Sequence, residues 1–168
     1  MQDTFGLSTY LKMRKMPAKK LNRYCVIVLF LPLPFFIQSC ASTGEFSEIA
    51  YRQSVILKVE TLELMNKASE SYSSHSAEVD SLVRKLKFAY EYAKGRPNNE
   101  IITKQWEIMI NPDRNLIGGF LRIWKEDLIL SPVFVNEAQE VISNAFDTII
   151  GLESGKIKPS EINEDNNG

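Results

Sequence analysis

Few side chains of this sequence could take part in catalysis or bind a metal. It contains one histidine, His75, and two cysteines, Cys25 and Cys40. Zinc sites combine several His, Cys and carboxylate ligands, and a Ser-His-Asp hydrolase needs a histidine beside its nucleophile. We therefore predict no metal, no cofactor and no histidine-dependent active site. We interpret His75 as a solvated residue of a serine-rich loop, with a pH-sensitive contact as the alternative.

Carboxylates are the remaining candidates for acid–base chemistry, because two of them can act as general acid and base without a histidine. Glu137, Glu140 and Asp147 lie close together in the sequence. Most of these positions point away from the apolar stripe of a predicted helix, which favours solvated charge. No residue is assigned as catalytic.

The charge of the chain is divided unevenly along its length. Residues 1–39 hold six Lys/Arg and one acid, which gives +5, and residues 40–168 hold 14 Lys/Arg and 20 acids, which gives −6. The overall net charge of −1 therefore conceals a basic leader and an acidic remainder. An acidic domain does not suit nucleic acid, so we exclude that partner.

An apolar run, residues 25–37, follows the basic stretch 12–23. A basic stretch, a short apolar stretch and small residues after it are typical of an export signal. A membrane-spanning helix needs about 20 apolar residues. This run has thirteen residues, among them Pro32 and Pro34, which disfavour a continuous helix. An uncleaved signal anchor is the alternative.

The end of this run, Ile37-Gln38-Ser39-Cys40, resembles the lipobox of bacterial lipoproteins. That pattern is an aliphatic residue, two mostly small residues and a cysteine, and only Gln38 departs from it. The resemblance implies that residues 1–39 are a cleaved signal peptide. It further implies that Cys40 carries a diacylglycerol and an acyl chain such as palmitate, which attach the exported protein to a lipid bilayer.

The neighbouring residues add two expectations. In Gram-negative lipoproteins an aspartate after the cysteine tends to hold the protein at the inner membrane, so Ala41 favours the outer membrane, facing the periplasm. Cys25 would leave with the leader and Cys40 would carry lipid. The mature domain would then contain no disulfide and would be held together by packing alone.

The mature chain predicts a short tether, a helical domain and a polar tail. Residues 40–46 form the tether, residues 47–155 show helical periodicity, and residues 156–168 have the composition of a disordered segment. We therefore predict one all-α domain, a small bundle of about five helices.

The apolar spacing also predicts how these helices face the core. The first helix begins after the cap Ser47, and the second near Ser76, so the serine-rich residues 69–76 read as a loop. Gly118 and Gly119 near the start of the fourth helix suggest either a close backbone contact or a later start of the helix. The predicted apolar face of the first helix consists of Tyr51, Val55, Val59, Leu62 and Met65. The fifth helix is predicted to begin after the cap Ser131, with Pro132 at its first position. Its predicted apolar face consists of Phe134, Ala138, Val141, Ala145, Ile149 and Leu152, widened by Val135, Ile142 and Phe146.

Two sets of side chains are candidates for binding. Arg84, Phe88 and Tyr92 recur every four residues and share one side of the second helix. Exposed aromatics with arginine are enriched at interfaces, although the same residues could pack on another helix. Trp106 and Trp124 could line an apolar pocket, but tryptophans among isoleucines and leucines are more often core.

These observations predict an envelope lipoprotein without catalytic activity. Its helical domain would act as a binding, adaptor or assembly module at the membrane face, with an envelope protein as its partner. Two alternatives stay open: a carboxylate-dependent hydrolase of envelope polymers, and a carrier or sensor of a small apolar ligand.

Overall fold

The computed structural model describes residues 44–162, and all regular secondary structure in this range is helical. This confirms the predicted all-α domain of about five helices. The lipobox residues Ile37, Gln38, Ser39 and Cys40 lie outside the described residues. The elements in chain order are α2 (Glu48–Met65), η1 (Asn66–Ser69), α3 (Tyr72–Lys94), α4 (Glu100–Ile110), α5 (Ile117–Asp127), α6 (Pro132–Glu153) and η2 (Pro159–Glu161).

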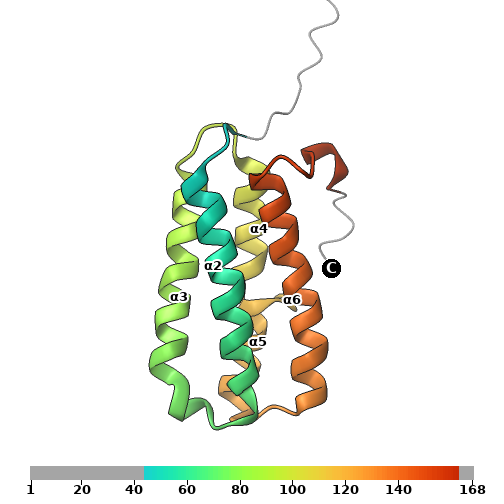
Figure 1. Cartoon of the computed structure of the whole chain (residues 1–168). Coiled ribbons are helices and arrows are strands. Elements are labelled where there is room, and N and C mark those ends of the chain that lie inside the picture. Colours follow the sequence, from blue (N-terminus) through green and yellow to red (C-terminus); the bar gives the residue numbers. More distant parts are fainter. Residues whose placement is uncertain (1–43, 163–168) are drawn as a thin grey trace, which may run out of the picture. The chain divides into compact units, whose positions relative to one another are not determined.

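The five α-helices fill four positions of a bundle (Figure 1). α2, α3 and α6 are the long helices, whereas the short helices α4 and α5 follow one another along the fourth position. The most extensive contacts join α2 to α6, α3 to α4 and α2 to α3. α2 therefore lies between two neighbours, which cover only part of its surface.

Local signals set the helix starts as the sequence predicts. The Ser47 hydroxyl caps α2 by accepting the N–H of Ala50 at 3.2 Å. The Ser131 hydroxyl caps α6 by accepting the N–H of Phe134 at 3.3 Å, and Pro132 occupies the first turn. Each cap satisfies a backbone donor that has no partner inside its helix.

The core is formed by large apolar side chains from all five helices. Its most completely buried members are Trp106, Trp124, Phe146, Leu57, Met65, Leu86, Ile102, Met109, Ile117, Ile142, Ile149 and Leu152. These side chains come from elements far apart in the sequence. Removing them from water provides the main favourable free energy of folding.

The corner between α4 and α5 depends on two glycines. A Cβ at Gly118 would lie 2.4 Å from the carbonyl oxygen of Ile110, and one at Gly119 would lie 1.9 Å from that of Arg114. Both distances are far shorter than a van der Waals contact, so only glycine fits at either position. The predicted close backbone contact is confirmed.

The predicted face of α2 is wrong in part. Val59 is 51 % exposed, and the buried residues lie on a neighbouring side of the helix. The spacing misled because α2 has apolar residues on both its inward and outward sides. The buried residues of α2 are Ala50, Ser54, Leu57, Thr61, Leu64 and Met65.

Two further boundaries and faces also differ from the prediction. α3 begins at Tyr72, so most of the serine-rich segment 69–76 belongs to a helix and not to a loop. In α6, Val135, Ile142 and Phe146 are buried as predicted, but Val141, at the centre of the predicted face, is 52 % exposed. The buried stripe of α6 is therefore rotated toward α2, its most extensive neighbour.

The segments flanking the bundle are more ordered than their composition predicts. Residues 157–162 include η2, and Ile157 and Ile162 pack against the core. A Cβ at Gly151 would lie 2.4 Å from Ile157, which shows how closely this segment approaches α6. These two isoleucines therefore place this part of the predicted polar tail against the bundle.

Candidate functional site

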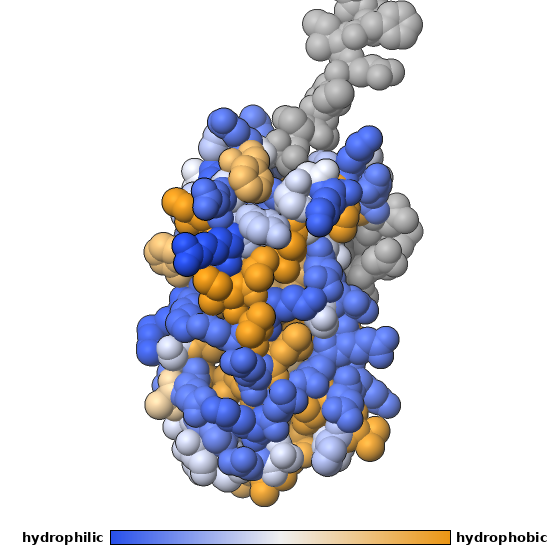
Figure 2. Space-filling view, in the orientation of Figure 1, coloured by the Kyte–Doolittle hydropathy of each residue, from blue (hydrophilic) through white to orange (hydrophobic). Residues whose placement is uncertain are grey.

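The outward side of α2 has an apolar stripe that the core does not cover. Ile49 is 63 % exposed and Ile56 is 44 % exposed, beside the exposed Val59. Figure 2 shows the resulting apolar patch over α2, with hydrophilic side chains around it. Steps of three and four residues place the whole set on one side of the helix. The α2 stripe, as we name it, consists of Ile49, Arg52, Ile56, Val59 and Glu63.

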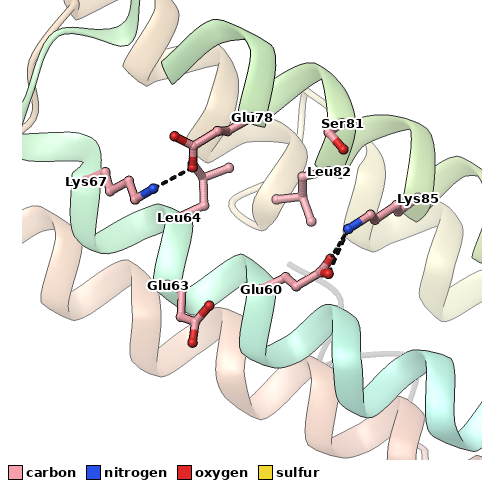
Figure 3. A pocket seen from close by; sticks show the side chains of 8 residues that line it. All are labelled: Glu60, Glu63, Leu64, Lys67, Glu78, Ser81, Leu82 and Lys85. Carbon is pink, nitrogen blue, oxygen red and sulfur yellow. Dashed lines mark hydrogen bonds and ion pairs between the residues drawn. The ribbon is translucent and has the colours of Figure 1, made fainter. Parts of the chain in front are cut away.

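A charged hollow of about 440 Å³ lies beside the stripe, between α2 and α3. Figure 3 shows the two ion pairs that cross it. Lys85 Nζ lies 2.7 Å from Glu60 Oε1, and Lys67 Nζ lies 2.5 Å from Glu78 Oε2. All four side chains are partly or largely exposed to solvent, so each pair stabilises the fold by less than about 1 kcal/mol. These charges are therefore available to a binding partner at low cost.

A second hollow of about 430 Å³ adjoins the first and shares Glu60 and Lys85 with it. Its border includes Ile49, Arg52 and Ile56, so the α2 stripe forms one wall of it. The two hollows together make an open groove that is apolar toward the start of α2 and charged toward its end. Such a surface suits a helix or an extended segment better than a small molecule, which needs an enclosing cavity.

None of the three residues predicted as a partner surface on α3 lines either hollow of this groove. Phe88 is 63 % exposed and Arg84 is exposed, as a partner surface requires. Tyr92 is only half exposed, because its hydroxyl lies 3.1 Å from the Ser47 hydroxyl at the start of α2. The role of these three residues stays a prediction, and the structure gives Tyr92 a second role in joining two helices.

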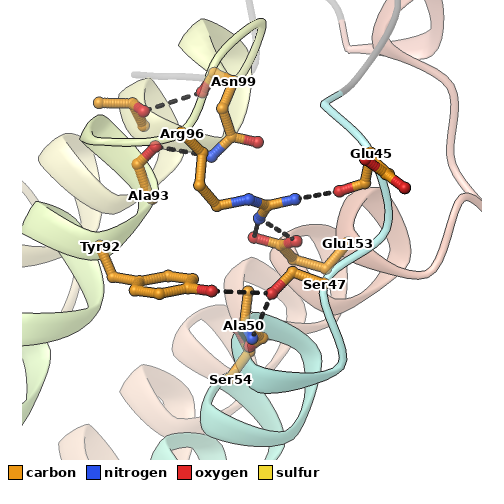
Figure 4. Close-up of polar contacts among 10 residues, drawn as sticks. Glu45, Ser47, Ala50, Ser54, Tyr92, Ala93, Arg96, Asn99 and Glu153 are labelled. Atoms are coloured by element: carbon orange, nitrogen blue, oxygen red, sulfur yellow. Dashed lines mark hydrogen bonds and ion pairs between the residues drawn. The ribbon is translucent and has the colours of Figure 1, made fainter.

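A buried ion pair joins the C-terminal ends of α3 and α6 (Figure 4). Arg96 Nη1 donates to both carboxylate oxygens of Glu153, at 2.7 and 2.9 Å, and Arg96 Nη2 donates to the carbonyl of Glu45. The side chain of Glu153 is only 1 % exposed. Burial raises the pKa of Glu153, and the nearby Arg96 guanidinium offsets only part of that rise. The pair also holds the segment before α2 on the bundle.

His75 is not the solvated loop residue that the sequence predicts. It lies in the first turn of α3, with 12 % of its side chain exposed. Nε2 lies 2.8 Å from Glu70 Oε2, Nδ1 lies 3.3 Å from Glu78 Oε1, and the ring is 5.9 Å from that of Trp124. The hydrogen bonds to Glu70 and Glu78 raise the pKa of His75. A pH-sensitive contact stays a prediction, now with defined partners.

The two tryptophans pack separately in the core. Trp106 lies edge-on to Phe146, with ring centroids 6.0 Å apart. Trp124 lies edge-on to Tyr72 at 5.5 Å, and its indole N–H donates to the carbonyl of Glu70 at 3.1 Å. Neither tryptophan borders the α2–α3 groove. Their surroundings favour the core interpretation over a shared ligand pocket.

The carboxylates show no catalytic pairing within residues 44–162. Glu137, Glu140 and Asp147 are exposed, and Asp147 Oδ2 lies 2.6 Å from Lys58 Nζ. Glu153 is the one buried carboxylate in this range, and Arg96 occupies both of its oxygens. A hydrolase that works through two carboxylates needs both of them facing one cleft. Glu60, Glu63 and Glu78 do line the charged hollow, but Lys85 and Lys67 pair with Glu60 and Glu78, and the hydrogen bond from Lys67 lowers the pKa of Glu78, which does not suit a general acid.

Sequence reasoning missed the α2 stripe, although its spacing was present in the sequence. The steps from Ile49 to Glu63 are three or four residues throughout, but the same helix also offers an inward series. The inward series contains Ser54 and Thr61, whose polar side chains hid it from a search for apolar residues. The signal available in the sequence was that α2 carries apolar residues at helical spacing on two different sides.

Neither a search for metal and membrane features nor comparison with known proteins assigns a function. The part of the chain that the structure describes contains no cluster of His, Cys, Asp and Glu arranged to hold a metal ion. Within the same residues, every helix is too short or too polar to cross a bilayer. The chain matches no known protein-family model, no curated protein and no solved structure.

Proposed function

We propose that this chain is an exported, lipid-anchored protein whose helical domain binds another protein through the α2 stripe and the adjoining groove. The observation that carries the binding role is the exposure of Ile49, Ile56 and Val59 on one side of a stable helix. Contiguous exposed apolar surface on a soluble domain marks an interaction site. The lipobox resemblance supports the anchor, through Cys40.

The anchor and the folded domain are close together in the chain. Only three residues separate Cys40 from Gly44, where the described structure begins, and an extended residue spans about 3.3–3.6 Å. A lipid on Cys40 would therefore hold the domain within about 15 Å of the bilayer. A module so placed acts on partners at the membrane face, as an adaptor or assembly factor does.

The anchor is tested by Cys40→Ser in the full chain expressed in a Gram-negative host. We expect the wild type in the membrane fraction, with its first peptide beginning at a lipid-modified Cys40. The variant should keep its leader and lack the lipid mass. A wild-type peptide spanning residues 37–42, intact and unmodified, would refute the anchor.

The binding role is tested by a photo-crosslinking amino acid at position 56 of the full chain in intact cells. We expect one discrete crosslinked band, whose partner mass spectrometry identifies. The control places the same crosslinker at Glu137, an exposed position on α6 away from the groove. Equal or diffuse labelling at both positions would remove the evidence for a specific binding face.

A further inference from the structure

We infer that the α2 stripe binds the same stripe of a second copy of this chain, with the two α2 helices antiparallel. The stripe has the step pattern of a helix–helix seam, since its members recur at intervals of three, four, three and four residues. Intervals of this kind keep one side of a helix in contact with another helix along its length. The spacing of the exposed α2 stripe therefore favours a helix as its partner.

The charges of the stripe specify that partner. Within the stripe, Arg52 lies near the start of α2 and Glu63 toward its end, with apolar residues between them. Glu60 lies next to the stripe, where it forms the exposed ion pair with Lys85. Neither Arg52 nor Glu63 forms an ion pair within residues 44–162. The complementary helix would present an acid, then apolar residues, then a base. α2 itself, read in the reverse direction, has this order.

A two-fold axis through Ile56 brings the complementary groups together. In an isologous pair each contact occurs twice, so a residue before the axis meets one equally far beyond it. Ile56 then faces Ile56 of the second copy. Arg52, four residues before the axis, faces Glu60 of the second copy and is one turn from its Glu63. A parallel pairing would instead place Arg52 beside Arg52, which like-charge repulsion disfavours.

The pairing also predicts how anchored copies would lie. Two antiparallel α2 helices direct their first residues to opposite ends of the pair. Because α2 has 18 residues at about 1.5 Å each, these ends are roughly 27 Å apart. If both copies carry lipid on Cys40, as proposed above, α2 must lie along the membrane. The pairing rests on the binding role proposed for the α2 stripe, with a second copy as the bound protein, but it does not depend on the anchor. A crosslink from position 56 to a different protein would keep the binding role and remove the pairing, whereas no crosslink at all would remove both.

The test uses full-length copies carrying two different epitope tags, co-expressed, solubilised in mild detergent and co-precipitated. Arg52→Glu in both copies should reduce recovery on the order of tenfold, because acids then face acids across the seam. Glu63→Arg in both copies should do the same with bases. A mixed pair, with Arg52→Glu in one copy and Glu63→Arg in the other, should recover to near the wild-type level. Circular dichroism should show unchanged folding, since both positions are exposed.

Cysteine crosslinking tests the direction of the helices in the same cells. Ile49→Cys in one copy should form a disulfide with Glu63→Cys in the other, and Ile49→Cys should not crosslink to itself. The parent chain gives the background from Cys25 and Cys40, and Val133→Cys, at a 67 % exposed apolar position elsewhere, is the matched control. The inference is overturned if the charge reversals leave recovery unchanged, if the mixed pair fails to recover, or if position 49 crosslinks only to itself.

Discussion

The inward and outward sides of α2 each contain residues of a type that is usual for the other side. The inward side includes Ser54 and Thr61, which are 1 % and 0 % exposed, whereas the outward side carries Ile49 and Ile56 in solvent. Burial on this helix therefore follows from what packs against it and not from hydropathy alone. An apolar side chain left outside a well-packed domain is informative, because nothing in the fold requires it there.

The small inward residues have a packing role. Ala50 and Ser54 lie against Tyr92, Ala93, Trp106 and Glu153, where α2, α3, α4 and α6 meet. The Ser54 hydroxyl donates to the carbonyl of Ala50 at 2.8 Å, so its polar group is satisfied within its own helix. Small side chains let α3 and α6 approach α2 closely at native packing density. Larger residues at these positions would separate the helices.

The largest expected effect is at the buried ion pair beside the inward side. Arg96→Met keeps much of the side-chain volume but leaves the Glu153 carboxylate buried without a counter-charge, which costs about 3–5 kcal/mol. Urea unfolding at pH 7 should show this loss in the free energy of unfolding. The control is Lys85→Met, which breaks the exposed pair with Glu60 and should cost less than about 1 kcal/mol. Equal losses would mean that burial does not distinguish the two pairs.

The raised pKa of Glu153 adds a pH dependence to the same test. Because the folded state binds this proton more tightly than the unfolded chain, the free energy of unfolding falls as the pH rises from about 4.5 through the raised pKa. Glu153→Gln removes the titrating carboxyl group and, with it, this pH dependence of the free energy of unfolding. Relative to this variant, the wild type should lose stability over that pH range. If the difference between their free energies of unfolding does not change with pH, the pKa of Glu153 is not raised in the folded state.

Adjacent residues on the two sides of α2 give the next test. Leu57→Ala, at 2 % exposure, should lower the free energy of unfolding by about 2–5 kcal/mol through lost burial and a cavity. Ile56→Ala, one residue away and 44 % exposed, should change it by less than about 0.5 kcal/mol in dilute protein. The measurement is urea unfolding of both variants. Similar losses would show that Ile56 belongs to the core after all.

Enlarging an inward residue should have a smaller effect. Ser54→Leu adds volume where the helices meet and should cost about 1–3 kcal/mol through overpacking. Val59→Leu adds one methylene on the outward side, at a position that is 51 % exposed, and should be close to neutral. Thermal melts followed by circular dichroism would compare them. A neutral Ser54→Leu would indicate unused space at the centre of the bundle.

The smallest expected effect is a gain in stability at the buried Thr61. The Thr61 hydroxyl is buried and has no hydrogen-bond partner among residues 44–162, so Thr61→Val should raise the free energy of unfolding by about 1 kcal/mol. Thr103→Val is the control, because the Thr103 hydroxyl donates to the carbonyl of Asn99 at 2.8 Å and its loss should not stabilise the fold. Urea unfolding measures both. A loss at Thr61→Val would show that its hydroxyl has a polar role in the folded state.

Sequence reasoning succeeded where the signal is local. The serine caps, Pro132 and the glycine pair at the α4–α5 corner each act within a few residues of themselves, and each is confirmed. It failed where a residue's surroundings come from distant segments. His75 looked solvated because its serine-rich neighbours suggested a loop, yet Glu70, Glu78 and Trp124 enclose it.

The sequence by itself determined that this protein is all-helical and where most of its helices begin, because caps and apolar spacing are properties of short segments. It also predicts the anchor at Cys40, through a pattern of four consecutive residues. Only the tertiary structure decided which side of α2 faces inward and which apolar residues stay exposed. The spacing of α2 supports either side, and the choice falls to the contacts that α3 and α6 make with it.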